Sequence, residues 1–162
     1  MRDHLSDLLH ARATSDGPRP FLCTRDSVLS FAACDELVSL LAGRLRAAGC
    51  APGQFVGVWC TNRPEFVISY FAVLRAGGIA VPLNPKLAPE ELRYMIGDAD
   101  MALVLHPPEL PCALPCAPVC ECVRDGITVV CAKTDQALRG RRPVFPATLD
   151  DIAVCIYTSG TT

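Results

Sequence analysis

The sequence has no excess of either charge and no long apolar run, and each absence argues against a class of function. The chain has 15 Lys and Arg residues against 17 Asp and Glu, a formal net charge of −2 at pH 7. This balance offers no basic face for a nucleic-acid backbone or for anionic lipid. No apolar stretch approaches the roughly 20 residues that a membrane-spanning helix requires. We therefore expect no nucleic-acid partner and no transmembrane segment.

The first 20 residues lack the continuous apolar core of a secretion signal. They carry Asp3 and Asp7 and are better explained as a weakly amphipathic helix with Leu5, Leu8 and Leu9 facing inward. Without a secretion signal, the 10 cysteines are more simply explained as reduced, buried thiols than as a disulfide scaffold. The sequence therefore predicts a cytoplasmic protein.

Helical and strand-like segments alternate along the chain. Apolar runs rich in β-branched residues predict strands, and apolar residues three or four positions apart predict helices. Strands are expected over residues 53–60, 78–84, 101–106, 126–132 and 152–156, helices over residues 30–48, 62–77 and 88–98, and two short extended segments around residues 25–27. Short connections between alternating strands and helices imply right-handed crossovers. The sequence therefore predicts a layered α/β fold in which helices flank a mainly parallel sheet.

Residues at the ends of these segments support the assignments. Ser30 and Asn62 are suited to accept hydrogen bonds from free amide groups at a helix start, and Pro64 suits a first helical turn. Gly49 is expected to end the helix that Ser30 begins, in a left-handed conformation. Pro82 is expected to mark the end of a strand. The inward face of the helix after Ser30 is expected to contain Leu37, Leu41, Leu45 and Ala48.

Residues 107–125 form a stretch rich in proline and cysteine. Its prolines remove backbone donors and exclude a helix, so we expect an irregular surface excursion. Four thiols in it are candidates for a zinc or iron–sulfur site: Cys112, Cys116, Cys120 and Cys122. Structural zinc sites usually use two separate pairs of closely spaced cysteines, which this pattern lacks. We favour a variable insertion with incidental thiols, and a metal or thiol module remains the alternative.

The other polar residues do not form a recognisable catalytic set. His4, His10 and His106 are scattered, and no nucleophile or carboxylate is placed to complete a triad with them. Asp98 and Asp100 are more simply explained as a solvated turn after a helix than as paired catalytic carboxylates. No G-x-G-x-x-G follows an expected strand, which argues against a dinucleotide-binding site.

A glycine and small hydroxylated residues follow the last expected strand, in the sequence YTSGTT at residues 157–162. Glycine lets backbone N–H groups approach an oxyanion, and the hydroxyl groups can donate further hydrogen bonds. The pattern is not the Walker sequence, which requires a second glycine followed by Lys and Ser or Thr. On these residues alone, a polar turn is the simpler interpretation and an oxyanion-binding loop is the alternative.

Three stretches, in order, resemble the AMP-forming adenylating enzymes, the superfamily of acyl-CoA synthetases, luciferases and the adenylation domains of peptide synthetases. YTSGTT resembles the first half of that family's phosphate-binding signature, which continues as Gly-x-Pro-Lys-Gly. Residues 74–96 resemble its second conserved stretch, and residues 29–45 resemble its first helix. Ala33 and Ala88 depart from the family, which usually has Glu at the first position and Thr or Ser at the second. Both lie at helix starts, away from the loop.

The resemblance implies that residues 1–162 are the leading, incomplete part of a large N-terminal adenylate-forming domain. It also implies a ligase that uses ATP and Mg²⁺ to convert a carboxylic acid, fatty or otherwise organic, to an acyl-adenylate and then, with coenzyme A, to a thioester. The residues that this resemblance assigns to the β- and γ-phosphates of ATP are Thr158, Ser159, Gly160, Thr161 and Thr162. VPLNP, at residues 81–85, favours the CoA-forming branch over amino-acid activation.

Other features of the family would lie beyond Thr162, among them the signature lysine, the acid pocket and the small C-terminal domain with its catalytic lysine. We therefore expect an N-terminal fragment that is inactive by itself, with a non-catalytic remnant or interaction protein as the alternative. We also expect poor solubility, because a sheet without its covering segments exposes apolar surface and strand edges. The sequence does not specify an oligomeric state.

Overall fold

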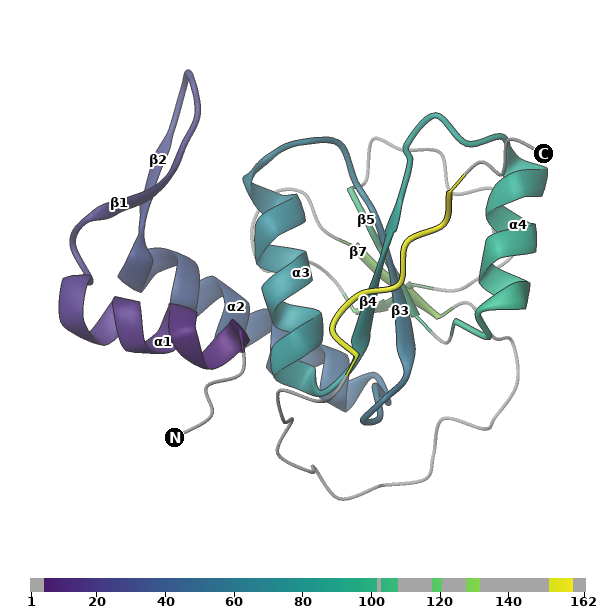
Figure 1. Ribbon diagram of the computed structural model, residues 1–162, viewed down its shortest axis with the longest axis horizontal. Coiled ribbons are helices and arrows are strands. Elements are labelled where there is room, and N and C mark those ends of the chain that lie inside the picture. The colour runs from purple at the N-terminus through teal and green to yellow at the C-terminus, as the bar shows by residue number, and fades with distance from the viewer. Residues whose placement is uncertain (1–4, 102, 108–117, 121–127, 132–151, 159–162) are drawn as a thin grey trace.

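The computed structural model describes residues 5–101, 103–107, 118–120, 128–131 and 152–158 (Figure 1). The helices in this part of the chain are α1 (Leu5–Asp16), α2 (Phe31–Ala47), α3 (Pro64–Ala76) and α4 (Pro89–Asp98). The strands are β1 (Pro20–Cys23), β2 (Val28–Ser30), β3 (Phe55–Trp59), β4 (Ile79–Leu83), β5 (Leu103–His106), β6 (Pro118–Cys120) and β7 (Thr128–Cys131). Figure 1 shows α3 and α4 on opposite sides of the central strands, with α1 and the β1–β2 hairpin beyond α3.

The larger sheet has the strand order β4-β3-β5-β7-β6. Strand β3 lies between β4 and β5 and is parallel to both, which confirms the predicted α/β fold. Strand β7 is antiparallel to β5 and to β6, so the sheet becomes mixed beyond β5. Strands β1 and β2 form a separate antiparallel hairpin, as the two short extended segments predicted.

Both faces of the parallel strands are buried, as expected for a parallel sheet between helical layers. Val56 and Val58 of β3 belong to one apolar cluster with Leu103 of β5 and residues of α2 and α3. The opposite cluster, on the α4 side, contains Trp59, Val81, Leu83, Leu92, Ile96, Ala99, Met101 and Val104. Space on this second side is tight at Gly57, where a Cβ atom would lie 2.9 Å from Leu83 Cδ1. The sheet therefore separates two cores.

The predicted helix starts are confirmed in one case and wrong by one residue in another. Ser30 is the N-cap of α2, and its Oγ accepts a hydrogen bond from the Ala33 N–H at 3.2 Å. For α3, the N-cap is Arg63 and not Asn62. The first helical residue there is Pro64, and the residue before a proline is held in an extended conformation. Asn62 therefore lies one position too early to cap the helix.

The inward face of α1 differs from the prediction. Leu9 is buried, but Leu5 and Leu8 are 40% and 47% exposed, so the predicted face is wrong for two of its three leucines. Ser6 and Leu9 are buried, and Ser6 and His10 contact Arg75 and Asp35 of the neighbouring helices, so these three residues of α1 lie at helical spacings of three and four. Two of these three residues are polar, and apolar periodicity does not detect such a face. Leu41 and Leu45 of α2 and Ala48 directly after it are buried as predicted, and Leu37 is half-buried.

Arg75 of α3 joins the first three helices. Its Nη2 donates to Asp35 Oδ1 on α2 at 2.6 Å and to the Ser6 carbonyl oxygen on α1 at 3.0 Å, and its Nη1 donates to Ser39 Oγ at 2.7 Å. His10 Nδ1 lies 2.9 Å from Asp35 Oδ2. Burial by itself raises the pKa of Asp35, but the bonds from His10 and Arg75 outweigh it and hold that pKa below its usual value. The carboxylate is thus the common partner of α1 and α3.

The strand predicted over residues 152–156 is reduced to one bridge, between Val154 and Ala80 of β4. Two backbone hydrogen bonds of Ala80, at 3.0 and 2.9 Å, hold the segment beside β4. The next residue of β4 that could extend this ladder is Pro82, which has no N–H to donate. The prediction that Pro82 ends its own strand is wrong by one residue, because β4 continues to Leu83.

The irregular excursion predicted over residues 107–125 is wrong in one part. Pro118–Cys120 forms β6, which pairs antiparallel with β7 with an irregular register. A proline is tolerated as the first residue of a strand, so it does not exclude strand structure as it excludes helix. Residues 108–117 and 121–125 lie outside the described residues. No helix in the described ranges is long and apolar enough to cross a membrane.

Candidate functional site

The carboxyl ends of β3, β4 and β5 lie at one edge of the sheet because the three strands are parallel. Trp59 ends β3, and its Nε1 donates a hydrogen bond to the Asn84 carbonyl oxygen just after β4, at 3.1 Å. The rings of Trp59 and His106, the last residue of β5, are 6.1 Å apart. Both side chains are buried. Ligands of open α/β sheets bind at this edge, which makes it the candidate site.

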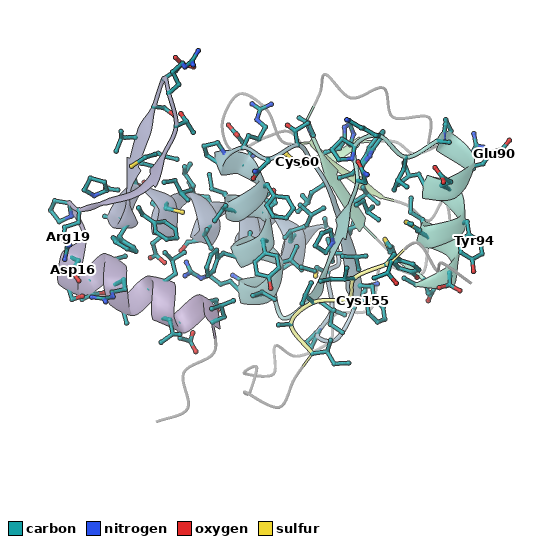
Figure 2. All side chains as sticks on the ribbon, turned by 45° about the horizontal axis from the view of Figure 1, so that its top comes forward. Asp16, Arg19, Cys60, Glu90, Tyr94 and Cys155 are labelled. Carbon is teal, nitrogen blue, oxygen red and sulfur yellow. The ribbon has the colours of Figure 1, made fainter. Side chains whose placement is uncertain are left out.

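Residues 152–158 run towards the same edge. The bridge between Val154 and Ala80 is parallel, so the segment follows the direction of β4. In Figure 1 it passes in front of β4 and continues towards the side of the sheet that α4 covers. Cys155, labelled in Figure 2, and Tyr157 pack against the apolar cluster on that side. The segment therefore leaves the sheet where a phosphate-binding loop of this fold is expected.

Of the residues predicted to bind phosphate, the structure describes one. Thr158 is exposed and directly follows the segment that β4 holds. Ser159, Gly160, Thr161 and Thr162 lie outside the described residues. Of the YTSGTT sequence, the structure thus describes Tyr157 and Thr158.

Tyr157 makes a contact that the sequence reasoning missed. Its hydroxyl donates a 2.6 Å hydrogen bond to Asp98 Oδ2, at the end of α4. This bond, with smaller contributions from burial and from the charge of Asp98, raises the pKa of Tyr157 to about 12. Asp98 was expected in a solvated turn, but it is the last residue of α4 and binds a partner 59 positions away. No local pattern in the sequence signals a pair so far apart.

An open concavity of about 530 Å³ lies beside this contact. Its walls come from the approach to β3, from the end of α4 and from the segment after residue 151, and its lining residues are Gly53, Gln54, Phe55, Asp98, Ala99, Asp100, Cys155 and Tyr157. Phe55 begins β3, so this concavity is near the amino ends of the strands. Tyr157, which directly precedes Thr158, lines it as well, so it also borders the segment that leads into the YTSGTT sequence.

The candidate metal ligands are only partly described. Cys120 lies in β6, and Cys112, Cys116 and Cys122 lie outside the described residues. Within the ranges that the structure describes, no group of three His, Cys, Asp or Glu side chains could hold a metal ion. His10 contacts Asp35, and His106 donates from Nδ1 to the Pro107 carbonyl oxygen at 2.8 Å. Neither histidine is brought near a nucleophile in this part of the chain.

Comparison with known proteins shows similarity to the AMP-binding enzymes. The family model of AMP-binding enzymes matches residues 9–162. The AMB antimetabolite synthetase AmbB of Pseudomonas aeruginosa is 37% identical over 164 residues, which cover 99% of this chain and 12% of that protein. A feruloyl-CoA synthase of an Amycolatopsis species is 32% identical over 136 residues, which cover 84% of this chain and 27% of that protein. The chain thus spans a small part of the length of these relatives.

The fold agrees with the same family. The N-terminal domain of FACL13 from Mycobacterium tuberculosis, solved with an inhibitor, superposes with a TM-score of 0.60 and 26% sequence identity. The superposition covers 64% of this chain and 26% of that chain. The family model, the two relatives and the fold agree with the resemblance first found at YTSGTT. This chain belongs to the family of AMP-binding, adenylate-forming enzymes.

Proposed function

We propose that this chain is part of a ligase that activates a carboxylic acid with ATP and transfers the acyl group to the thiol of coenzyme A. The observation that carries the proposal is the parallel bridge between Val154 and Ala80, which sets the chain in the direction of β4 shortly before YTSGTT. Family membership supports the nucleotide, and the VPLNP sequence and the similarity to a feruloyl-CoA synthase support the CoA acceptor.

The proposed chemistry has two steps. A carboxylate oxygen attacks the α-phosphorus of ATP, the bond to the β-phosphate oxygen breaks, and acyl-adenylate and pyrophosphate form. The sulfur of coenzyme A then attacks the acyl carbon, AMP leaves and the thiol proton goes to solvent. The part that we assign to residues 158–162 is to hold the β- and γ-phosphates with hydroxyl and backbone N–H donors, which stabilises their charge in the first step. We assign no ligand for the Mg²⁺ that accompanies ATP to the described residues.

We expect the 162 residues alone to show no ligase activity. The matched residues cover 27% of the feruloyl-CoA synthase and 12% of AmbB, and the resemblance implies that the acid pocket and the catalytic lysine lie outside that share. Phosphate binding is a narrower property that residues 158–162 could show by themselves, because backbone and hydroxyl donors at one loop suffice for it.

A second candidate is activation of an acid for an acceptor other than coenzyme A. It is favoured by the similarity to the AmbB synthetase, which is higher in identity and coverage than the similarity to the feruloyl-CoA synthase. The resemblance to the adenylation domains of peptide synthetases has the same implication. The first step is common to both candidates, so they differ in the acid and in the acceptor.

We also propose a cytoplasmic location, because several cysteines of the described ranges form no disulfide bond. Among them are Cys23, Cys34, Cys50 and Cys155. Burial is the main reason why the pKa of Cys34 and of Cys50 rises to about 11, so both remain protonated and unreactive at neutral pH.

Phosphate binding can be tested on the ¹⁵N-labelled chain. We expect ATP and pyrophosphate, each with Mg²⁺, to shift the amide signals of residues 158–162 in a saturable way. AMP has no β- or γ-phosphate and should not shift them. The hydroxyl-bearing turn at residues 24–27 is the internal control, since its Thr24 and Ser27 hydroxyls already bond within the turn. Equal shifts with AMP, or none with pyrophosphate, would refute the assigned role.

The reaction can be tested on the natural polypeptide that contains these residues. Acid-dependent exchange of labelled pyrophosphate into ATP is expected with an organic acid, and CoA thioester is expected when coenzyme A is added. Exchange with an amino acid but no thioester would favour the second candidate. No exchange with any acid would leave a non-catalytic protein as the interpretation.

A further inference from the structure

Helix α1 is held to the rest of the molecule largely by polar contacts. Of its 12 residues, all of which the structure describes, Ser6 and Leu9 are buried. Leu9 is thus the one apolar side chain of α1 that is buried, in the cluster that it shares with α2 and α3. A helix of about 12 residues is marginal by itself in water and usually depends on a buried apolar face. With so little apolar burial, α1 depends on hydrogen bonds to stay in place.

The polar contacts of α1 meet one charged pair, Asp35 of α2 and Arg75 of α3. His10 Nδ1 lies 2.9 Å from Asp35 Oδ2, and the Ser6 carbonyl oxygen accepts from Arg75 Nη2 at 3.0 Å. Asp35 and Arg75 also bind each other at 2.6 Å, and Arg75 donates to Ser39 of α2. If α1 moved away, these last two contacts would remain, so neither charge would be left buried without a partner. The contacts of Ser6 and His10 with this pair are called the α1 latch below.

The C-terminal end of α1 is attached in a different way. The Gly17 carbonyl oxygen accepts from the Ala32 N–H, and the Arg19 carbonyl oxygen accepts from the Phe31 N–H, each at 3.0 Å. Gly17 packs so closely that a Cβ atom there would lie 2.7 Å from the Ala13 carbonyl oxygen and 3.4 Å from the Ala32 Cβ. These backbone contacts join the end of α1 to the start of α2 and do not involve the latch. Helix α1 is therefore fixed at one end and latched along its body.

We propose that α1 is a hinged strap, which opens from α2 and α3 at the latch while those helices and the sheet stay folded. Gly17 is the fixed end about which the strap opens. Once detached, a helix of this length loses its internal hydrogen bonds, so its amides exchange with solvent. The inference is independent of the proposed ligase chemistry. It concerns a helix that lies beyond α3, away from the central strands, in Figure 1.

Two variants weaken the latch. His10→Ala removes the contact of α1 with Asp35, and alanine favours the helix itself, so faster exchange could not come from a weaker helix. Asp35→Asn removes the charge that both His10 and Arg75 contact. The matched control is Arg12→Ala, because Arg12 is on the same helix and its guanidinium bonds to Asp16 of α1 itself.

A third variant weakens the fold without touching the latch. Ile96 is buried in the cluster on the α4 side of the sheet, across the sheet from α2 and α3. Ile96→Val removes one methylene group there and is mild enough to leave the protein folded. It lowers the stability of the core equally whether α1 is closed or open, so it should not change how often the strap opens.

Native-state hydrogen exchange on the full ¹⁵N-labelled chain, at several low urea concentrations, tests the proposal. In the unchanged protein, the amides of residues 9–14 should be at least about tenfold less protected than those of residues 56–58 in β3. Their exchange should also depend less on urea, because opening one helix exposes less surface than global unfolding. His10→Ala and Asp35→Asn should speed exchange at residues 9–14 about three- to tenfold, and Arg12→Ala should leave it within about twofold. Ile96→Val should speed exchange in β3 about two- to tenfold and leave residues 9–14 unchanged.

Each measurement can overturn the proposal. Equal protection and equal urea dependence in α1 and β3 would mean that α1 opens only when the whole protein unfolds. Faster exchange in α1 with Ile96→Val would mean the same. Unchanged exchange in α1 with His10→Ala or Asp35→Asn would show that the polar pair is not the latch. An effect of Arg12→Ala as large as that of His10→Ala would show that the strength of the helix, and not the latch, controls the opening.

Discussion

At the scale of single residues, charged and polar contacts determine which face of α1 packs against α2 and α3, and apolar patterns do not. Ser6 and His10 of α1 contact α2 and α3 through Arg75 and Asp35, where the sequence predicted leucines. The side chains of Asp35 and Arg75 are 13% and 16% exposed, so this ion pair is shielded from water much more than a surface pair. Its loss should therefore be measurable.

We expect Asp35→Asn to lower the free energy of unfolding by about 2–3 kcal/mol at pH 7, because Arg75 would lose its charged partner. The pKa of Asp35 is lowered in the folded protein, so the carboxylate stabilises the fold above its unfolded pKa of about 3.9. This stabilisation is lost as the pH falls through the folded pKa. The difference between the two proteins in urea unfolding should thus be present at pH 7 and shrink below about pH 4.

Glu36→Gln is the matched control, because Glu36 is the neighbouring carboxylate on α2 and is exposed. It should change the free energy of unfolding by less than about 0.5 kcal/mol. A difference between Asp35→Asn and the unchanged protein that persists at about pH 2 would contradict the role given to the charge.

At the scale of the elements, the sequence predicted helix ends and strands correctly where neighbouring residues determine them. The N-cap at Ser30, the left-handed Gly49 and the strands β3, β4 and β5 follow from side-chain chemistry within a few residues. The reduced strand at residues 152–156 could not be predicted in this way. Its pairing depends on Pro82, which lies on a different segment and is brought beside it by the fold.

In the candidate site, too, features carried by adjacent residues could be predicted from the sequence, and contacts between distant residues could not. YTSGTT and its resemblance to a phosphate-binding signature were readable in the sequence, because the loop chemistry is carried by adjacent residues. The contact of Tyr157 with Asp98 was not readable, since it depends on where α4 ends in space. Apolar periodicity likewise missed the contact face of α1, because a hydrogen-bonded face has no apolar repeat.

Two helix starts offer a reciprocal test. Ser30→Ala should destabilise the protein by about 1 kcal/mol, because the Ala33 N–H would lose its acceptor.

At the start of α4, Glu91 already accepts a hydrogen bond from the Ala88 N–H at 2.8 Å, but the Ala88 side chain has no acceptor for a second hydrogen bond. Ala88→Ser should complete that capping box and stabilise by about 0.5–1 kcal/mol. Urea unfolding with an unchanged m-value measures both, and equal signs for the two changes would refute this account.

At the scale of the whole molecule, the edge beside β4 presents apolar side chains to water. Ile152 and Ile156 are 61% and 66% exposed, on a segment that pairs with the sheet through one bridge. An apolar segment at a sheet edge is a site for association with another chain. The low solubility predicted from the sequence stays a prediction, and these residues are where we expect association to begin.

We expect Ile152→Lys/Ile156→Lys to reduce association of the chain at about 10–100 µM, as measured by sedimentation velocity. Leu8→Lys is the control, because Leu8 is 47% exposed on α1, at the far side of the molecule in Figure 1. It adds a positive charge without changing this edge, so it should leave association as it was. A monomeric unchanged protein over that concentration range would contradict the prediction.

The proline in β4 has a consequence for the direction of the neighbouring segment. If residues 152–158 paired with β4 along their whole length, the chain would continue in the plane of the sheet. Because Pro82 has no N–H, the pairing ends after one bridge, and the chain beyond Val154 turns out of that plane towards α4. One missing N–H thereby ends the backbone pairing of this segment, and Tyr157 finds its hydrogen-bond partner on α4 instead of on a strand.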